Sequence, residues 1–574
     1  MKMRFLATFL AAALIVPAQQ VQPGTPAPKP EGATVKLGEG ASSRIDGPLG
    51  DVHAPWAMTG SWFRTYFGAT DTRVVLEGPV RLKDYVVDGK LTLSLRAYLD
   101  LVVANNTDLA IQKLTLEVPK NAIQRAFGVF DPTLTSNFSA TRATTPTTNQ
   151  LQGALVLSTL NQPFNARYQQ LLPTSTTVFS QLNWSKNSTN DTFQLFNPAY
   201  TNTWQMGFIQ PLLRNRGKYI TKLPITIARA QLNQQTFNTV DQIQRLILTA
   251  ENAYWDVVSA RERLKVQEQA LALADAALKR AQRELELGAT SPLEIFQPQQ
   301  NYATAEIALT QVKYQLSIAE DSLRRQIGAD LDPEVRKLPI VLTEEVKPEI
   351  EEATPDTETA IQTAMTNRPD LKAARTALDI NDLQIQNALN AVKPLLNLQG
   401  SYQTYGRGGP GYVRQVTPPL FVPGGPGDAW GQLFGFDYNT FAFSLNLNLP
   451  LRDRAGAANL ADATVNKRLN ALRERSLEQQ IRNEVLTAIN QVENSKASVR
   501  LAQVALDYAQ KRADADQKRY DLGVINIFFL LSAQNDLTTA QSNLVNQTVQ
   551  YRRNALTLQQ RLGTLLQSRG IVIQ

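Results

Sequence analysis

The chain of 574 residues contains no cysteine and a single histidine, His53. Without cysteine it can form no disulfide, carry out no thiol chemistry and offer no thiol for acylation. It also lacks an uncharged run of the roughly 20 apolar residues that a membrane-spanning helix requires. These absences exclude a disulfide-rich domain and a helical membrane protein, so any membrane attachment has to come from the fold itself.

The motifs that mark common active sites are missing as well, among them HExxH, Walker A, GxSxG and GxGxxG. Carboxylates alternate with Lys and Arg, a pattern typical of solvated helix faces. The net charge of +7 is small for this length and dispersed along the chain. We therefore expect no enzyme, no metal or other cofactor and no nucleic-acid partner, and energy for any transport would come from another protein.

The N-terminal region indicates export. Residues 1–18 combine Lys2 and Arg4 with an apolar run and small residues near Ala18, which predicts a secretory signal peptide. Residues 19–90 follow as a Pro/Gly-rich N-terminal extension, for which we predict a flexible or polyproline-like leader. At the other end, residues 567–574 form a short C-terminal tail.

The remainder of the chain contains one unit twice. Eleven residues of the first copy recur in the second at a constant offset of 235 positions. They are Ala253, Val257, Leu271, Ala274, Leu287, Gly288, Gln299, Ala305, Leu309, Leu323 and Gly328. Further upstream, Asn105, Asp108, Leu109 and Pro132 recur at an offset of 262. Such self-similarity indicates a duplicated structural unit, which we place at 91–342 and 343–566.

Each copy contains a long helix and a shorter one. Large apolar residues seven positions apart, such as Leu264, Leu271 and Leu278, run beside a line of alanines, which predicts a coiled-coil seam. The pattern covers 225–286 and 457–521, so each helix would be about 90 Å long at 1.5 Å per residue. Both end at a Leu-Gly pair, where Gly288 or Gly523 can take the left-handed cap. Second heptad helices are predicted over 293–327 and 528–562.

Before each long helix, apolar residues alternate with uncharged polar ones, most clearly over 134–138, 204–208, 396–402 and 441–449. An apolar face opposite an Asn/Gln/Ser/Thr face is typical of a strand between lipid and a wet lumen. An exported sandwich domain shows similar alternation. We predict four strands and long loops over 142–173 and 406–435; residues 176–186 form either an extra strand or part of a loop.

Four strands cannot close a barrel within one chain, because eight is already the small end of what spans a membrane. Open sheet edges are not tolerated in lipid. Either several copies each contribute four strands to one barrel, or the strands do not lie in a membrane.

The order helix, strand pair, long helix, Leu-Gly turn and helix, present twice, resembles the TolC-like outer-membrane efflux proteins over about 91–566. Gln210-Pro211-Leu212-Leu213 precedes the first long helix and Ala253-Tyr254-Trp255-Asp256 lies within it, as in that family. The resemblance implies an α+β fold in a homotrimer. Long coiled-coil hairpins would form a periplasmic tunnel, and each protomer would add four strands to a twelve-stranded transmembrane β-barrel.

The resemblance further implies the outer membrane of a Gram-negative-type bacterium, with contact to its lipid and extension into the periplasm. The protein would be the passive exit duct of a tripartite efflux or type I secretion system. Its partners would be a periplasmic adaptor protein and an inner-membrane pump. Residues 329–355 would form a mixed equatorial segment around the tube.

A gate at the helix tips also follows from the resemblance. Tyr520, three residues before Gly523, and Glu294, six residues after Gly288, stand where the best-known member of the family has a closing network. The arginine of that network is replaced here by Ile525. Two of the three residue types expected for that network are therefore present and one is absent.

The positions of an inward-facing acidic pair in that relative are Phe529 and Ser532 here. Phe529, with Ile525 and Phe528, belongs to a largely apolar run over 525–531, which predicts a hydrophobic constriction that gates by dewetting. Alternatively, these aromatic side chains pack the tip helices or dock the adaptor. A periplasmic coiled-coil scaffold or adaptor without a channel is the alternative function, but it would not need strands with one lipid-compatible face.

Overall fold

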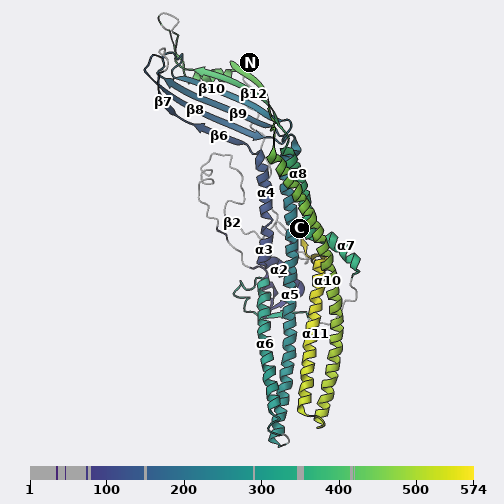
Figure 1. Ribbon diagram of the computed structural model, residues 1–574. Coiled ribbons are helices and arrows are strands. Elements are labelled where there is room, and N and C mark those ends of the chain that lie inside the picture. Colours follow the sequence, from purple (N-terminus) through teal and green to yellow (C-terminus); the bar gives the residue numbers. More distant parts are fainter. Residues whose placement is uncertain are drawn as a thin grey trace, which may run out of the picture.

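The computed structural model describes residues 79–147, 152–288, 291–344, 355–413, 418 and 420–573, together with the short strands at 34–35, 45–46 and 73–74. The predicted signal peptide and most of the N-terminal extension lie outside these residues. The molecule is elongated, with a broad sheet at one end and long, nearly parallel helices that run away from it (Figure 1). In the described part of the chain, none of the helices is both long enough and apolar enough to cross a membrane.

The helices fall into long pairs and short connecting segments. They are α2 (Leu95–Asn105), α3 (Thr107–Leu114), α4 (Glu117–Phe127), α5 (Lys218–Glu286), α6 (Phe296–Gln326), α7 (Thr357–Asn367), α8 (Pro369–Ala391), α9 (Pro426–Gly435), α10 (Arg454–Asp521), α11 (Ile527–Arg561) and α12 (Leu565–Ser568). The 3₁₀ segments η1 (Leu82–Tyr85) and η2 (Gly128–Phe130) precede β4 and β6. Both copies contain the predicted hairpin of a long and a shorter helix, α5–α6 and α10–α11.

The long helices begin earlier than the heptad pattern predicts. Helix α5 starts at Lys218 and contains Pro224 in its second turn. This proline removes one backbone hydrogen bond of the helix, yet the helix continues through it. Helix α10 starts at Arg454, because the side chain of Asp453 caps it by accepting a hydrogen bond from the Gly456 N–H at 2.7 Å.

The strands form one large sheet and several small ones. The large sheet contains β6 (Thr133–Phe138), β7 (Thr141–Pro146), β8 (Val156–Leu171), β9 (Thr177–Thr189), β10 (Ala199–Pro211), β12 (Leu395–Gly408) and β15 (Tyr438–Asn448). The short strands are β1 (Thr34–Val35), β2 (Ile45–Asp46), β3 (Arg73–Val74), β4 (Val86–Val87), β5 (Lys90–Leu93), β11 (Ile340–Leu342), β13 (Gly411–Val413), β14 (Leu420–Val422) and β16 (Val572–Ile573).

The large sheet is an antiparallel series in the order β15-β12-β10-β9-β8-β6, and β7 pairs with the far half of β8. Because β6 and β7 share one partner, they form a single row, and the sheet has six rows rather than the predicted four. The four predicted strands are confirmed as β6, β10, β12 and β15, and 176–186 is a strand, β9. The prediction of a loop over 142–173 is wrong, since β8 crosses it, and 406–435 carries β13, β14 and α9.

Strand β8 was missed because its sequence weakens the alternation and contains Pro163 in its middle. The neighbouring strand explains how this proline is accommodated. The Ser139 N–H donates to the Pro163 carbonyl at 3.1 Å, so the backbone polar groups of Pro163 face the break between β6 and β7. The N–H that proline lacks would therefore point at a place where the pairing is already interrupted.

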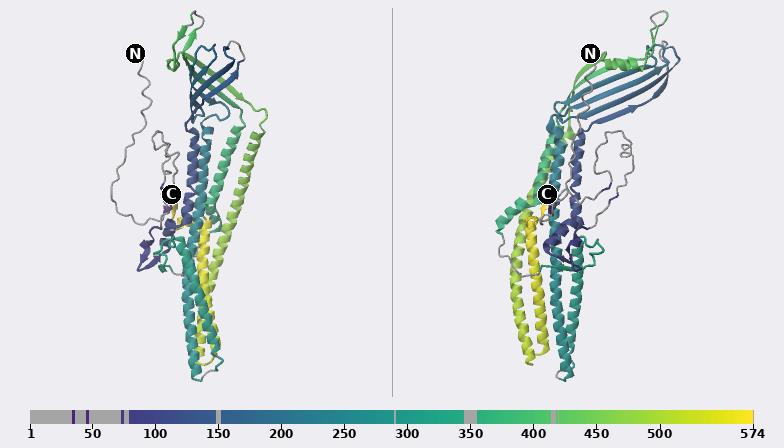
Figure 2. Two further views of the ribbon diagram at one scale, coloured as in Figure 1. Left: turned by 90° about the vertical axis from the view of Figure 1, so that its left-hand side faces the viewer. Right: turned by 180° about the vertical axis from the view of Figure 1, so that it is seen from behind.

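Each copy has a junction at which the end of one helix meets the start of another. We call the helix on the tip side of the junction the lower helix and the one on the sheet side the upper helix. Helix α6 ends beneath α3, and α11 ends beneath α8 (Figures 1 and 2). Gly328 and Gly563, each with a φ near +70°, follow these lower helices, and a Cβ on Gly563 would lie 3.0 Å from the carbonyl carbon of Asn367. The duplicated glycines and asparagines, far apart in the sequence, thus meet at one level of the molecule.

The junctions lie beside the two main apolar cores. One core joins α2, α5, α6, β5 and the C-terminal segment around Leu91, Tyr98, Tyr254, Leu323 and Ile571. The other joins α7, α10 and α11 around Ala364, Ile481, Val485 and Leu558. This equatorial level fixes the directions of both hairpins, whose free ends lie at the opposite end of the molecule from the sheet (Figure 2).

Candidate functional site

The two hairpin tips turn at the predicted glycines. Gly288 has a φ of 71° and Gly523 a φ of 73°, and nothing lies within 4 Å of a Cβ added to either. The glycines are therefore required by the left-handed backbone and not by lack of space. At the second tip the Gly523 N–H donates to Tyr520 O and the Val524 N–H to Arg519 O, both at 2.9 Å, which is the Schellman arrangement.

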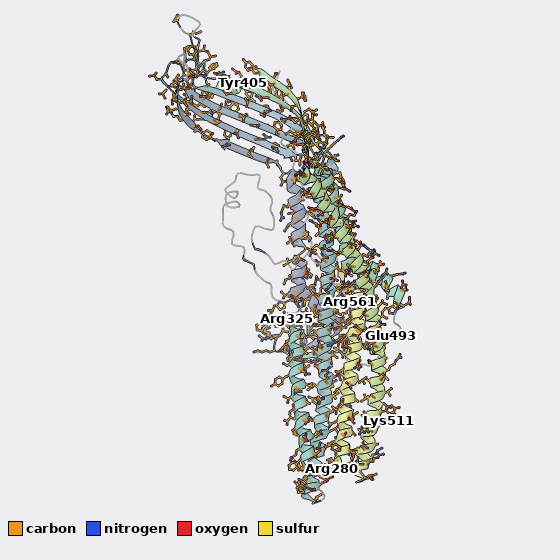
Figure 3. The ribbon with its side chains drawn as sticks, in the orientation of Figure 1. Arg280, Arg325, Tyr405, Glu493, Lys511 and Arg561 are labelled. Atoms are coloured by element: carbon orange, nitrogen blue, oxygen red, sulfur yellow. The ribbon has the colours of Figure 1, made fainter. Side chains whose placement is uncertain are left out.

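A group of polar side chains joins the two tips; we call Arg280, Glu284, Tyr520 and Asp521 the tip cluster. The Arg280 guanidinium donates to Asp521 Oδ1 at 2.5 Å and to Glu284 Oε1 at 3.0 Å. It also lies over the Tyr520 ring, 4.5 Å from its centroid. The Tyr520 hydroxyl donates to Glu284 Oε2 at 3.1 Å. Arg280 lies close to the free end of α5, where the two hairpins approach each other (Figure 3).

The electrostatics of the tip cluster follow from these contacts. Partial burial, together with the hydrogen bond and charge of Glu284, raises the pKa of Tyr520 to about 12, and the charge of Glu294 adds to this rise. The hydrogen bond from Arg280 holds the pKa of Asp521 below its ordinary value. At neutral pH the tyrosine is therefore a hydrogen-bond donor and the aspartate an anion. Because Arg280 and Asp521 are both more than 40% exposed, salt screens their attraction.

Apolar contacts support the tip cluster from behind. Ala281 of α5 packs with Ile527 and Leu531 of α11, and Tyr520 borders the same group. The small Ala281 side chain at this point allows α5 and α11 to lie close together. The polar contacts consequently lie on the outside of a small apolar seam.

The predicted gate residues divide into two groups. Tyr520 takes part in the tip cluster, whereas Glu294 is exposed and its N–H donates to Ser291 O at 3.0 Å. Ile525 is half-buried in the second turn. Phe528 and Phe529 are 55% and 54% exposed, and their rings meet edge to face with centroids 5.7 Å apart. More than half of each of these aromatic side chains is therefore exposed at the second tip of the protomer.

Sequence reasoning missed the arginine of the tip cluster. The expected arginine position is Ile525, but Arg280 on the preceding hairpin supplies a guanidinium to the same tyrosine. Its signal was present: Arg280 and Glu284 lie four residues apart on one helix face, directly before Gly288. That spacing is common on exposed helices, so only the approach of the two hairpins distinguishes this pair from the others.

Further contacts continue the seam between the hairpins. Asn535 of α11 donates to Asn301 of α6 at 3.1 Å, and Arg263 of α5 donates to Asn546 of α11 at 2.7 Å. Arg553 pairs with Asp256 beyond them. In the described part of the chain, no cluster of three or more His, Cys, Asp or Glu side chains is arranged to hold a metal ion.

Comparison with known families identifies a match over most of both copies. The family described as outer membrane efflux protein matches residues 165–329 and 360–564, which is more than half of the chain. The chain is similar to outer membrane protein TolC of Vibrio cholerae, with 23% identity over 323 residues that cover 56% of this chain and 68% of that protein.

A second relative is the probable efflux pump outer membrane protein TtgC of Pseudomonas putida, at 22% identity. The alignment covers 57% of this chain and 63% of that protein, which is less than two thirds of its length. Among solved structures, the Campylobacter jejuni CmeC outer membrane channel has a TM-score of 0.60 at 14% identity and covers 86% of this chain and 90% of that one. At such identity the likeness shows a shared fold.

Proposed function

This chain belongs to the outer membrane efflux protein family, and on that basis we propose that three copies of it form a passive exit duct across the outer membrane and the periplasm. The duplicated unit at 91–342 and 343–566 would supply the wall of the duct twice per protomer. Substrates would reach the duct from an inner-membrane pump through a periplasmic adaptor protein.

The observation that carries this proposal is the continuity between sheet and helices. Strand β6 follows α4, β10 leads into α5, β12 follows α8, and β15 leads into α10, so four strands continue directly into four helical columns (Figure 1). Along these strands one face is mainly apolar and the other carries mainly Asn, Gln, Ser and Thr. Such a wall suits lipid on the outside and water within, and its lumen would extend into the space between the helices.

The gate is proposed at the tip cluster. Arg280, Tyr520 and Asp521 hold one hairpin against the other, and each of their polar contacts is at least partly exposed. Exposed ion pairs are individually weak, so a docking adaptor can replace them without unfolding either hairpin. Phe528 and Phe529 project from the second tip and would either line the constriction or contact the adaptor.

The test is single-channel recording on the purified protein in planar lipid bilayers, with the oligomer size measured by cross-linking of the same preparation. Arg280→Ala should raise the single-channel conductance, because the hairpins separate at the tip. Lys279→Ala is the matched control: it removes the same charge one residue away, where Lys279 pairs with Asp275 of its own helix at 2.8 Å. The control should conduct as the wild type does.

Equal conductance of both variants and the wild type would remove the tip cluster from the gate while leaving the duct in place. A soluble, monomeric and non-conducting protein would overturn the duct itself and favour the periplasmic scaffold.

A further inference from the structure

Two of the six strand rows have no helical continuation. Strands β8 and β9 are joined by a tight turn at the helical end of the sheet, whereas β6, β10, β12 and β15 each connect there to a helix. The first copy therefore carries an additional hairpin between β6–β7 and β10. This β8–β9 hairpin either forms part of the barrel wall in the membrane or lies outside that wall.

The register places β8 and β9 in the wall. Ala166 pairs with Leu182, and Leu182 pairs with Trp204 of β10, so the apolar residues share one face. Asn165 pairs with Asn183, and Asn183 with Thr203, on the opposite face. Further apolar residues of the first face on the added rows are Leu160, Phe164, Tyr168, Val178 and Trp184.

The same two faces continue across the second copy. Met206 of β10 pairs with Tyr402 of β12, and Tyr402 pairs with Phe441 of β15. The rings of Tyr402 and Phe441 lie 4.9 Å apart. Apolar residues thus occupy one face of every row from β6 to β15, with some polar positions among them, such as Ser180 between Tyr168 and Met206. The added rows place most of their apolar residues on this same face.

The turn of the added hairpin is anchored to the long helix. Ser175, with a φ of 74°, is 3% exposed, and its hydroxyl donates to Gly217 O at 3.0 Å. It also lies 2.5 Å from the Thr221 hydroxyl in the first turn of α5. Because the buried Ser175 side chain ties this turn to the start of α5, the hairpin is held at the same level as its neighbours and not displaced from the sheet.

The outer rows of the sheet lack partners on one side within the described protomer. Every residue of β6 and β7 at one edge is exposed, and so is every residue of β15 at the other. Unpaired backbone groups are not stable in lipid, so the edges have to pair with other copies. Since neighbouring rows run antiparallel and their number is even, β15 of one copy can pair antiparallel with β6–β7 of the next.

We propose that the trimer closes an eighteen-stranded barrel, six rows from each copy, in place of the twelve strands that four rows would give. The proposal rests on the trimeric duct of the proposed function. Barrel diameter grows roughly linearly with strand number, so the outer-membrane opening is about half again as wide as that of a twelve-stranded barrel. Only four of the six rows connect to helices of the tube. The other two, β8 and β9, are joined to each other at the helical end of the barrel by residues 172–176.

The decisive experiment is electron cryomicroscopy of the full-length protein in lipid nanodiscs, in which the strands around the barrel are counted. Eighteen strands support the proposal. A trimer with twelve strands and the β8–β9 hairpin outside the wall overturns it but leaves the proposed function intact, whereas the absence of any trimer removes both.

Cysteine labelling tests the same point without a structure, since the natural chain has no cysteine. Asn165→Cys and Ala166→Cys probe the two faces of β8, and Thr203→Cys and Met206→Cys are the matched controls on β10. With a membrane-impermeant thiol reagent in proteoliposomes, Asn165→Cys should react like Thr203→Cys, and Ala166→Cys should react about tenfold more slowly, like Met206→Cys. Equal, fast labelling of both β8 positions, with the β10 contrast preserved, would show that the hairpin is not part of the wall.

Discussion

At the first helix junction Asn106 faces Gln326, whereas at the equivalent second junction Arg368 faces Glu484 and Arg561. The backbone is nearly the same in both: φ and ψ are −66° and 119° at Asn106 and −61° and 124° at Arg368. The side chains have diverged completely. Asn106 caps α3 by accepting from the Leu109 N–H at 3.0 Å and donates to Gln326 Oε1 at 2.9 Å, so this junction is neutral.

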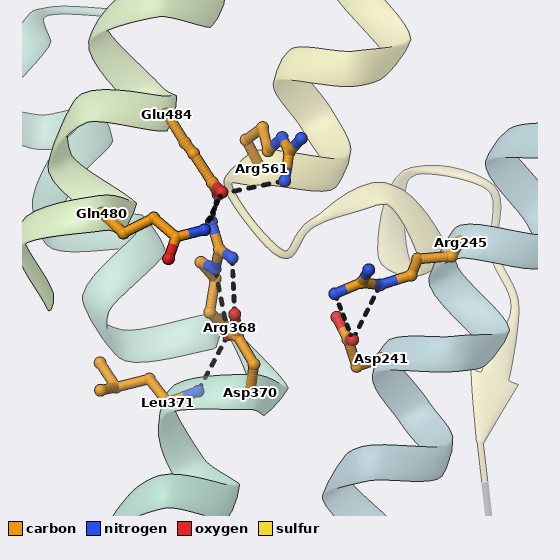
Figure 4. Close-up of polar contacts among 8 residues, drawn as sticks. All are labelled: Asp241, Arg245, Arg368, Asp370, Leu371, Gln480, Glu484 and Arg561. Atoms are coloured by element: carbon orange, nitrogen blue, oxygen red, sulfur yellow. Dashed lines mark hydrogen bonds and ion pairs between the residues drawn. The ribbon is translucent and has the colours of Figure 1, made fainter. Parts of the chain in front are cut away.

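The second junction is a buried ion network (Figure 4). The Arg368 side chain, 6% exposed, contacts Asp370 Oδ2 and Glu484 Oε2, each at 2.6 Å. Arg561, at the position equivalent to Gln326, contacts the same Glu484 oxygen at 3.1 Å. Two cations thus face two carboxylates. Duplication preserved the chain path, and the polar chemistry could change because every buried group still has a partner.

The largest difference between the two junctions is expected in the free energy of unfolding when Arg368 or Asn106 is replaced. Arg368→Met leaves Asp370 without its cation and Glu484 with Arg561 as its remaining one, and breaking such a buried network typically costs about 3–5 kcal/mol. We expect that loss in the free energy of unfolding, measured by denaturant titration in detergent. A loss no larger than that of Asn106→Ala would show that the network contributes no more than the neutral pair.

Acid should weaken the second junction and not the first. Burial alone would raise the pKa of Glu484, but hydrogen bonds and charges from Arg368, Gln480 and Arg561 outweigh it and lower the pKa below its ordinary value. Its stabilisation is therefore complete above the ordinary glutamate pKa and is lost as the pH falls through the lowered value. The thermal unfolding temperature of the protein should therefore decrease over that acidic range.

Glu484→Gln should remove this acid-dependent contribution and cost about 1.5–3 kcal/mol at neutral pH, because charge-assisted hydrogen bonds to two arginines are lost. The measurement is the unfolding temperature of variant and wild type across the acidic range. An unchanged slope in the variant would assign the acid sensitivity to other groups.

The neutral junction should be weaker and insensitive to pH. Asn106→Ala removes the cap of α3 and the contacts with Gln326, a loss of about 1–2 kcal/mol. The difference in unfolding temperature between Asn106→Ala and the wild type should stay constant between neutral and acidic pH. A difference that grows or shrinks with pH would indicate a charged partner at this junction.

The smallest effect is expected where an arginine joins the same helices on the surface. Arg375 of α8 pairs with Glu474 and Glu478 of α10 at 3.2 and 3.3 Å, but its side chain is 51% exposed. Arg375→Ala should therefore cost at most about 1 kcal/mol after solvent screening. A cost equal to that of Arg368→Met would mean that burial does not distinguish the two sites.

Much of the fold could be predicted from local patterns. The seven-residue repeat predicted both helix hairpins, and the Leu-Gly pairs placed both tips, because helix period and left-handed glycine are properties of short segments. Strands β12 and β15 were equally clear, since Tyr402, Phe441 and their neighbours alternate strictly with polar residues. The duplication followed from constant offsets between the two copies.

The tertiary structure alone decided the six-row sheet, the tip cluster and the two junctions. Pro163 obscured β8 because a proline inside a central strand normally breaks its pairing, and only the neighbouring rows show that the pairing is already interrupted at that point. Arg280 and Glu284 look like any exposed pair until the second hairpin brings Tyr520 to them. Arg368 and Glu484, 116 positions apart, form an ion network only because α8 and α10 pack together. In each case the interaction joins segments distant in the chain, and no local pattern encodes that approach.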